Sequence, residues 1–327
     1  MAHPMKSITN IVLMLSIWWL TSFSLYAEST KNVLIIKGHA TMFSEVEKGI
    51  YDDLEGEVTF STLSISKKSK VKDLKQHMVK FQPDIIILMG NKAVNLYADY
   101  QALDLSKNYP PAVAVAALFI DQVNTGLKNV TAIRYEIPAV IGAVSIRSIL
   151  QKPVKKIGVV YREWMTEMIE ENRRYCAQEG IELVSIQLPN KMKNVSKKVK
   201  RALNTLSSEV DVMWILNDNG LLTKDAIVKA WLPDRAKSRL PAIVGIKQFI
   251  TKIPLGAFAV VPDNYGLGAQ TAEMVFEIMD NNWQLDEVKV HQPLSVKKFL
   301  NAKSLDNRGI RIKEERLGQM DEIIEKQ

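Results

Sequence analysis

Polar and aromatic side chains follow several apolar runs that have the length of buried strands. The segment Gly38–Phe43 follows the first run, precedes a helical pattern and contains His39, Thr41 and Phe43. Free N–H groups at the start of such a helix attract a carboxylate or a phosphate, although an ordinary strand-to-helix turn has the same composition. Gly90, Asn91 and Lys92 occupy the equivalent place after another apolar run. We therefore expect both segments to border a ligand.

Three further strand ends carry groups that suit ligand binding. Asp121 and Gln122 follow a very apolar strand, so we expect their polar groups at a rim or in a site. Arg162 and Trp164 pair a guanidinium with an aromatic ring, which can clamp a carboxylate or stack on a ring. Trp164 is equally compatible with packing between lobes. The run Asn217, Asp218 and Asn219 could bind an amino or hydroxyl group, and the same residues are also common turn formers.

Two extended segments that lead into helices are predicted to cross between halves of the molecule. Asp263 and Tyr265 lie at one such segment, where they could touch a ligand or stiffen a hinge. Arg134 and Tyr135 occupy the corresponding place earlier in the chain, and we expect them to act at the hinge.

The sequence contains no recognised catalytic, metal or cofactor motif. It has neither a Gly-x-Ser-x-Gly elbow nor a phosphate-binding Gly-x4-Gly-Lys-Ser/Thr, and Gly266 to Gly268 lacks the rest of a dinucleotide fingerprint. Its four histidines are scattered, and its only cysteine, Cys176, lies on an apolar helix face, where we expect it in the core. We therefore predict a non-enzymatic binding protein with no metal and no cofactor.

The elements that would position these residues alternate between strand and helix. Short apolar runs of the kind buried on both faces occur at 32–36, 84–89, 112–119, 156–161 and 211–216. Helical patterns lie between them, the first beginning near Ser44, which forms a capping-box pattern with Glu47. This alternation predicts an α/β fold with parallel sheets flanked by helices.

The same order of elements occurs twice, at an offset of about 124–130 residues, so we expect two Rossmann-like lobes. In such sheets ligands bind beyond the carboxyl ends of the strands, and facing edges would form one cleft. We predict a first lobe of residues 28–132 with about 263–286, and a second of about 133–262 with 287–327. A hinge of several strands would join them.

Composition and the N-terminus bear on location. Residues 1–27 combine one lysine, Lys6, with an apolar run that ends in Ala27, as in a secretory signal peptide, and no cysteine follows for lipidation. The run is also long enough for an uncleaved anchor. The chain has 43 basic and 36 acidic residues, and the excess lies mainly in lysine runs without interleaved aromatic residues. We therefore expect a monomeric periplasmic protein and no nucleic-acid partner.

These segments together resemble the ABC-transporter substrate-binding protein family that includes periplasmic proteins for tryptophan and tyrosine. The resemblance spans about 33–312 and rests on residues 83–90, 119–121, 129–131, 157–161, 210–218, 256–272 and 294–302. The chain departs from the family pattern at Gln122, Ala132 and Lys298, where proline, glycine and asparagine are usual.

The resemblance implies a type I periplasmic-binding-protein fold with a multi-strand hinge. It also implies capture of a small solute, such as an amino acid, between lobes that close on it, and delivery to a membrane permease. The departures beside Asp121 and Thr131 border the expected cleft, so the family's ligand preferences do not transfer directly. A periplasmic sensing subunit that docks on a membrane signalling protein has the same sequence features, and this alternative stays open here.

Overall fold

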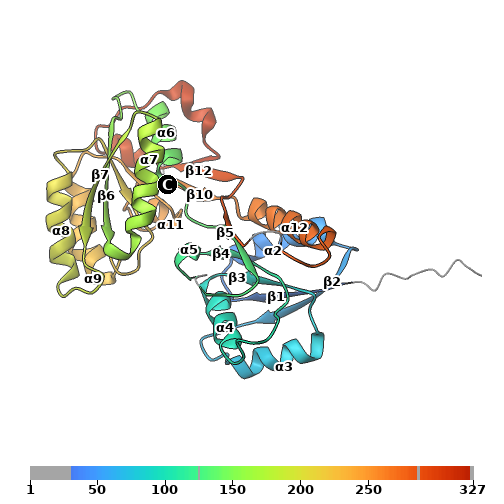
Figure 1. Ribbon diagram of the computed structural model, residues 1–327. Helices are drawn as coiled ribbons and strands as arrows, with labels where there is room; N and C mark the ends of the chain where they lie inside the picture. The colour runs from blue at the N-terminus through green and yellow to red at the C-terminus, as the bar shows by residue number, and fades with distance from the viewer. Residues whose placement is uncertain (1–30, 124–125, 286–287, 325–327) are drawn as a thin grey trace, which may run out of the picture.

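The computed structural model describes residues 31–123, 126–285 and 288–324, which form two α/β lobes (Figure 1). The proposed signal peptide, residues 1–27, lies outside these residues. Within them, no helix is long and apolar enough to cross a membrane. The first lobe contains a six-stranded sheet and the second a seven-stranded sheet.

The first sheet has the strand order β11-β5-β4-β3-β1-β2, and its neighbouring strands run parallel. Its strands are β1 (Lys31–Lys37), β2 (Val58–Ser64), β3 (Ile85–Met89), β4 (Ala112–Ala117), β5 (Val130–Arg134) and β11 (Val290–His291). The helices of this lobe are α2 (Met42–Leu54), α3 (Val71–Phe81), α4 (Asn91–Gln101), α5 (Ile120–Val123) and α12 (Asn264–Asp280).

Alternate residues of β1 pack in two separate hydrophobic cores, one on each face of the sheet. Val33 and Ile35 pack in the cluster that includes residues of α2 and α12, whereas Leu34 and Ile36 pack in the cluster that includes residues of α3 and α4. This alternation follows from the two-residue period of a strand. It explains why strands buried on both faces appear in the sequence as continuous apolar runs.

Helices α2 and α12 cross at a pair of glycines. A Cβ atom added to Gly49 would lie 2.3 Å from the carbonyl oxygen of Tyr265, and one added to Gly268 would lie 2.1 Å from that of Val46. Gly268, which the sequence analysis excluded from a dinucleotide site, therefore permits close helix packing.

The second sheet has the order β13-β12-β10-β9-β8-β6-β7. Its strands are β6 (Lys156–Arg162), β7 (Glu182–Leu188), β8 (Val212–Ile215), β9 (Ala242–Val244), β10 (Phe258–Pro262), β12 (Val296–Leu300) and β13 (Glu322–Ile323). The helices are α6 (Ala139–Ile149), α7 (Thr166–Gln178), α8 (Val195–Leu206), α9 (Lys224–Ala226), α10 (Leu232–Lys237), α11 (Gln248–Thr251) and α13 (Ala302–Asp306), and a π-helical turn at Ile227–Trp231 joins α9 to α10. The pairing of β10 with β12 is antiparallel and the other pairings given for this sheet are parallel, so the sheet is mostly parallel.

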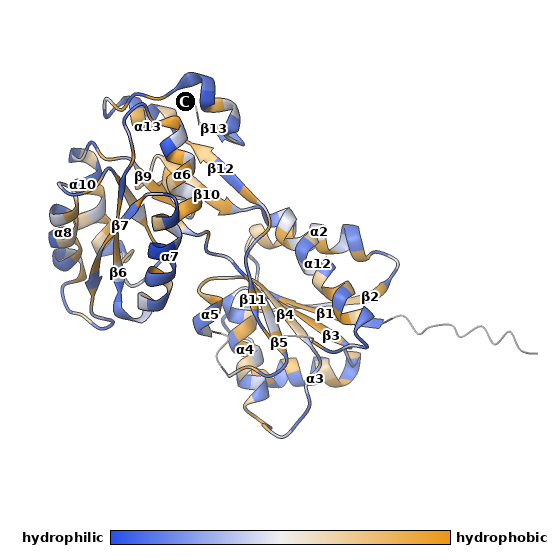
Figure 2. Ribbon diagram, turned by 45° about the horizontal axis from the view of Figure 1, so that its top comes forward, coloured by the Kyte–Doolittle hydropathy of each residue, from blue (hydrophilic) through white to orange (hydrophobic). Residues whose placement is uncertain are grey.

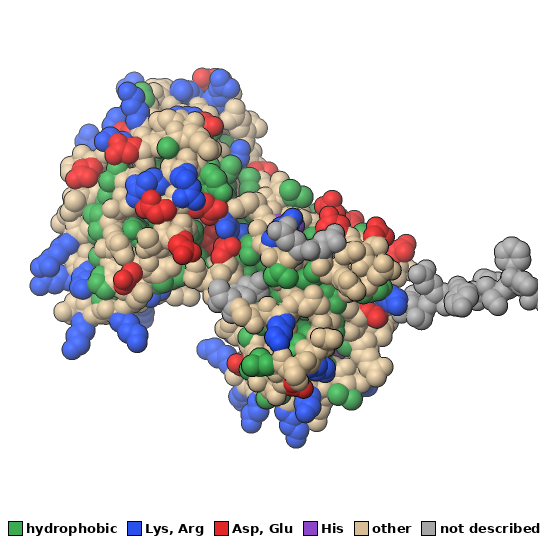
Figure 3. Space-filling view, in the orientation of Figure 1, with side chains coloured by type: hydrophobic (Ala, Val, Ile, Leu, Met, Phe, Trp, Pro, Cys, Tyr) green, Lys and Arg blue, Asp and Glu red, His purple; other side chains and the backbone are tan. Residues whose placement is uncertain are grey.

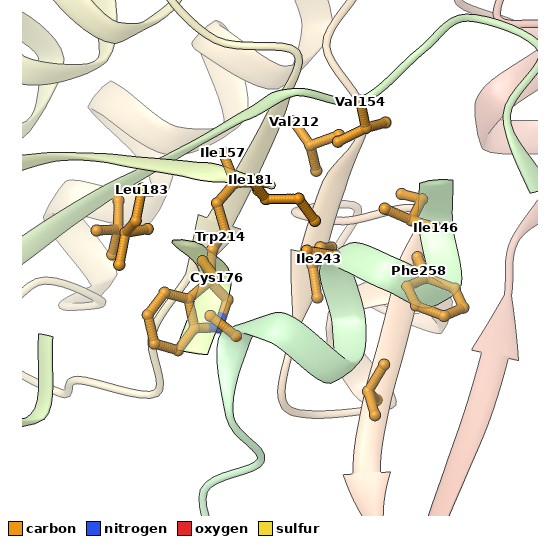
Figure 4. Close-up of a cluster of buried hydrophobic side chains, with 14 of the residues drawn as sticks. Ile146, Val154, Ile157, Cys176, Ile181, Leu183, Val212, Trp214, Ile243 and Phe258 are labelled. Carbon is orange, nitrogen blue, oxygen red and sulfur yellow. The ribbon is translucent and has the colours of Figure 1, made fainter. Parts of the chain in front are cut away.

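Packing in the second lobe confirms two predictions about individual segments. Cys176 is fully buried in the cluster shown in Figure 4, beside residues of α6 and β6, and burial raises the pKa of its thiol to about 11. Helix α8 buries Val199, Leu203 and Leu206, and its lysines lie on its outer side. Figure 2 shows the same division along this helix, with hydrophobic colour inside and hydrophilic colour outside.

The chain passes between the sheets three times. It leaves the first sheet after β5 and enters α6, returns after β10 through Asp263 into α12, and leaves again between β11 and β12. Because β11 pairs with β5 in the first sheet, the last passage follows His291. The boundary that we predicted at 287 is therefore a few residues too early.

Candidate functional site

A large cleft lies between the lobes and has a volume of about 1050 Å³. The first lobe contributes the loop after β1, the loop after β3 and part of the segment after β4. The second lobe contributes the segment after β9, the start of α11 and parts of β10, β12 and β13. Figure 3 shows the two lobes as separate masses joined by a narrower region. We refer to this space as the interlobe cleft.

The loops after β1 and β3 are held together by one aromatic ring. A Cβ atom added to Gly90 would lie only 2.7 Å from Cζ of Phe43, and one added to Gly38 would lie 3.6 Å from Cε2 of the same ring. Gly90 also has φ 81° and ψ 162°, a conformation that is essentially restricted to glycine. Phe43 is half-buried and lines the cleft, so its ring both fixes the loops and forms part of the cleft wall.

Asn91 lines the cleft, but its amide already has partners. Its Nδ2 donates to the carbonyl oxygen of Leu118 at 2.7 Å, and its Oδ1 accepts from the N–H of Leu118 at 2.8 Å. The side chain therefore fixes the segment after β4. His39 and Thr41 line the same cleft and are exposed.

The start of α2 differs from the prediction. The helix begins at Met42, its N-cap is Thr41, and the cap residue makes no side-chain hydrogen bond. Glu47 forms an ion pair with Lys37 at the end of β1. The Ser44–Glu47 capping box does not form because Ser44 already lies inside the helix.

The second-lobe wall contains residues that the sequence analysis did not select. Lys247 forms an ion pair with Glu322 and lies 4.5 Å from the centre of the Phe299 ring. Lys297 pairs with Asp263, its Nζ lying 3.0 Å from Oδ1. Residues 246–248 follow β9, so the strand-end rule that selected the other loops would also have selected them.

A narrow pocket next to the cleft surrounds the crossover from β5 to α6. Tyr135 lines both spaces, and burial raises the pKa of its phenol to about 12. Asn217, at the end of β8, donates from Nδ2 to the carbonyl oxygen of Gly245 at 3.3 Å. Its Oδ1 is buried and has no hydrogen-bond partner among the described residues. A buried acceptor without a partner costs about 1–3 kcal/mol.

A smaller cavity of about 280 Å³ lies on the other side of the crossover and contains Asp121, Gln122 and Trp164. Asp121 and Gln122 lie within the short helix α5, and they line this cavity and not the interlobe cleft. Arg134 links the two lobes here, because it pairs with Asp121 of α5 at 2.9 Å and with Glu171 of α7 at 2.8 Å. We call this space the side cavity.

An aromatic contact and a buried acid lie beside that ion pair. Phe119 of the first lobe meets Trp164 of the second edge to face, with ring centres 4.9 Å apart. The N–H of Phe119 donates to Glu136 at 3.0 Å. Burial raises the pKa of Glu136 to about 7, although the Phe119 N–H acts against this shift. The charge of Arg134 also acts against the raised pKa of Glu136.

Arg162 and Asp218, both predicted to contact ligand, contact each other. Nε of Arg162 donates to one carboxylate oxygen of Asp218 at 2.6 Å, and Nη2 donates to the other at 2.5 Å. Asp218 is 2% exposed. Neither residue lines the interlobe cleft, the crossover pocket or the side cavity. Arg162 also lies against the Trp164 ring, 5.5 Å from its centre, so the pair supports that ring.

Asp263 and Tyr265, both at the second crossover, have different contacts. Asp263 caps α12 by accepting from the N–H of Tyr265 at 3.2 Å, and it also pairs with Lys297. The Tyr265 hydroxyl donates to Asp52 of α2 at 3.0 Å, and Lys48 lies over its ring. The structure therefore places Tyr265 on the α2–α12 surface and not among the residues that line the cleft.

The donor groups of the described residues can be surveyed for a metal site. In the described ranges, no group of three or more His, Cys, Asp or Glu side chains is placed to hold a metal ion. The cleft is lined by three basic and three acidic side chains, together with two rings, Phe43 and Tyr135, from the first lobe and its crossover. It can therefore surround a small molecule of low net charge that has an apolar part.

Two α/β lobes, three crossings and a cleft lined by both lobes define the architecture of type I solute-binding proteins. Residues 46–324 match the model of the ABC transporter substrate binding protein family, and the chain belongs to this family. No curated protein matches the chain at a significant level.

Solved structures agree with this fold. An ABC domain from Streptococcus pneumonia in complex with L-Trp is 20% identical, with a TM-score of 0.58 over 90% of this chain and 100% of that chain. A conserved domain protein from Vibrio cholerae is also 20% identical, with a TM-score of 0.56 over 90% and 99%. The ligand-free, open structure of a Clostridium difficile substrate binding protein with adhesive properties is 13% identical, with a TM-score of 0.66 over 91% and 100%.

Proposed function

We propose that this protein is the exported solute-binding component of an ABC importer and that it delivers a small solute to a membrane permease without transforming it. The cleft of about 1050 Å³, lined by both lobes, is the observation that carries this proposal. A solute that contacts both walls binds the closed form more tightly than the open form, and this difference shifts the population towards closure. Export would follow from the apolar segment at 1–27.

We further propose that the solute is an amino acid with an aromatic or other large apolar side chain. Phe43 and Tyr135 offer ring surfaces, and the free Oδ1 of Asn217 can accept from an ammonium group. Lys92 lines the cleft, is exposed and has no ion-pair partner among the residues described, so it can receive the carboxylate. The equal number of basic and acidic side chains in the cleft suits a zwitterion. The L-Trp complex of the Streptococcus neighbour supports the same ligand class.

A thermal-shift screen of the purified protein with amino acids, nucleosides and sugars tests this function. A ligand at 100 times its Kd stabilises the folded protein by about 2.7 kcal/mol. We expect one or a few amino acids to raise Tm, and we expect mass spectrometry to recover them unchanged. Stabilisation by sugars or nucleosides alone would contradict the ligand class, and recovery of a product would contradict the binding role.

Matched variants locate the binding site. Phe43→Ala and Asn217→Ala should each raise the Kd of the amino acid that the screen identifies by about tenfold. This change corresponds to about 1.4 kcal/mol of binding free energy. Tyr265→Phe is the control, because this ring is 40% exposed on the α2–α12 surface. Equal losses in all three variants would show that the ligand does not bind where we place it.

A further inference from the structure

A second large cavity, of about 1000 Å³, lies in the second lobe, away from the crossover. It borders the segment between α6 and β6, the exposed side of α8 that carries Lys200 and Asn204, the region from α10 to β9, and residues 308–311 after α13. Figure 2 places α8, α10 and α13 around the end of this lobe that points away from the first lobe. None of its lining residues lines the interlobe cleft or the side cavity. We refer to it as the basal pocket.

The charges of the basal pocket are strongly unequal. Six of its lining side chains are basic and only two are acidic; the basic ones are Lys152, Lys200, Lys237, Arg239, Arg308 and Arg311. Both acids already have partners. Asp211 accepts from the backbone N–H groups of Lys155 and Lys156 at 2.9 and 3.0 Å, and Asp234 pairs with the buried Arg235.

Most of the basic side chains have no such partner. Lys152 lies 3.7 Å from Asp211, but the other five form no ion pair with any residue that the structure describes. The pocket therefore has a positive field that its own carboxylates do not balance, and a field of this kind concentrates anions.

Two guanidiniums meet at one carbonyl in the wall. Nη1 of Arg235 and Nη1 of Arg308 each donate to the carbonyl oxygen of Leu240 at 3.2 Å. Arg235 is 2% exposed and is neutralised by Asp234, whereas Arg308 is half-buried without a carboxylate of its own. Burial, and then the charge of Arg235, lower the pKa of Arg308. A bound anion would relieve both effects.

The rim that carries Arg308 is attached firmly to the opposite wall. The N–H of Gln151 donates to the carbonyl oxygen of Arg311 at 3.1 Å, and the N–H of Lys313 donates to that of Ile149 at 2.7 Å. Leu150 and Ile312 form an antiparallel bridge. The backbone of residues 311–313 is thus held against the α6–β6 segment, which fixes the position from which Arg308 and Arg311 extend.

We propose that the basal pocket is a second ligand site, which binds a small soluble phosphate ester such as a sugar phosphate. Guanidinium groups recognise phosphate through paired, charge-assisted hydrogen bonds. The volume is in the range of small-molecule sites, which are concave, whereas a lipid surface requires a flat or convex basic face. Because this site is separate from the cleft, the proposal stands independently of the solute that the cleft binds.

Calorimetry with three probes tests this proposal on the purified protein. Glucose 6-phosphate should bind, inorganic phosphate should bind more weakly because it fills less of the pocket, and glucose should not bind. Binding should weaken as NaCl rises, because salt screens the exposed lysines. Equal signals from glucose and glucose 6-phosphate would overturn the proposal. Binding to phosphatidylglycerol vesicles without binding of glucose 6-phosphate would also overturn it.

Variants place the site. Arg308→Gln should raise the Kd of glucose 6-phosphate by about tenfold or more, because it removes a charge-assisted hydrogen bond to the phosphate. Arg239→Gln removes an exposed charge from the pocket lining, so the protein should still fold. It should raise the Kd of glucose 6-phosphate several-fold. Lys193→Gln is the control of equal charge change, because Lys193 is exposed and outside the pocket. Phe43→Ala should leave binding unchanged. A similar loss in Lys193→Gln, or a loss confined to Phe43→Ala, would refute the assignment.

Discussion

The contact between Gly90 and the Phe43 ring gives the sharpest test of the cleft. In Gly90→Ala, the new methyl group would lie 2.7 Å from Cζ of Phe43 and 3.6 Å from the carbonyl oxygen of Ala116. The backbone at φ 81° and ψ 162° costs a residue other than glycine about 1–3 kcal/mol. Displacing the packed ring adds about 1–3 kcal/mol. We therefore expect Gly90→Ala to lower the free energy of unfolding by about 2–6 kcal/mol.

Two further variants separate the backbone cost from the ring contact. Gly56→Ala has a comparable positive φ of 88°, but no heavy atom lies within 4 Å of its added Cβ. It should therefore lose only about 1–2 kcal/mol. In the double variant Gly90→Ala/Phe43→Ala the methyl group no longer meets a ring, so part of the Gly90→Ala loss should disappear.

Urea denaturation followed by circular dichroism measures these differences, with the transitions of the two lobes fitted separately. The double-mutant cycle should give a coupling of about 1–3 kcal/mol between positions 43 and 90. Coupling below about 0.5 kcal/mol, or equal losses in Gly90→Ala and Gly56→Ala, would refute the placement of the ring between the loops after β1 and β3.

Three other perturbations test the region where the lobes meet. Arg134→Gln removes the pairs with Asp121 and Glu171 and should destabilise the protein by about 1–3 kcal/mol. Arg147→Gln removes one more accessible pair, with Glu179, and should cost only about 0–1 kcal/mol. Equal losses in urea denaturation would contradict the link between the lobes. Glu136 has a folded pKa of about 7 and an ordinary value of 4.5, so its protonated form contributes stability that is complete below about pH 4.5 and is lost as pH rises through about 7. Glu136→Gln should therefore gain Tm relative to the original protein between pH 5 and pH 8, and a constant difference would contradict this sign. The ring of Trp164 meets Phe119 of the other lobe, so the change in tryptophan fluorescence that the amino acid ligand causes should disappear in Trp164→Phe. The ring of Trp231 is buried within the second lobe, so the change should persist in Trp231→Phe.

The strand-end rule shows how far a sequence alone can locate a site. Apolar runs such as Ile85–Met89 are buried on both faces, so their pattern depends on the sheet alone and is readable without the fold. The polar residues that follow these runs then reach the cleft edge, as His39 and Asn91 do. The start of α2 was misplaced because the helix begins at Met42, two residues before Ser44, and Glu47 pairs with Lys37 of β1 instead of closing a capping box.

The rule cannot tell which of these residues have free polar groups. Arg162 and Asp218 are 56 positions apart and neutralise each other, and Asn91 uses its whole amide on the backbone of Leu118. Such pairs depend on side-chain distances between loops, for which a single sequence contains no signal. Asn217 looked no more promising than Asp218 in the sequence, yet its Oδ1 is one of four buried side-chain atoms that lack a hydrogen-bond partner among the described residues.

The two large cavities differ in how their charges are balanced, and this difference separates their ligands. In the cleft, Lys247 and Lys297 are paired with Glu322 and Asp263, and basic and acidic lining residues are equal in number. An anion would gain little there, whereas a zwitterion can form both kinds of contact without leaving net charge in a partly dry space. In the basal pocket the cations outnumber the acids three to one, and both acids are occupied. A zwitterion would leave that excess in place, and only an anion offsets it. A ligand that binds one cavity well is therefore expected to bind the other poorly.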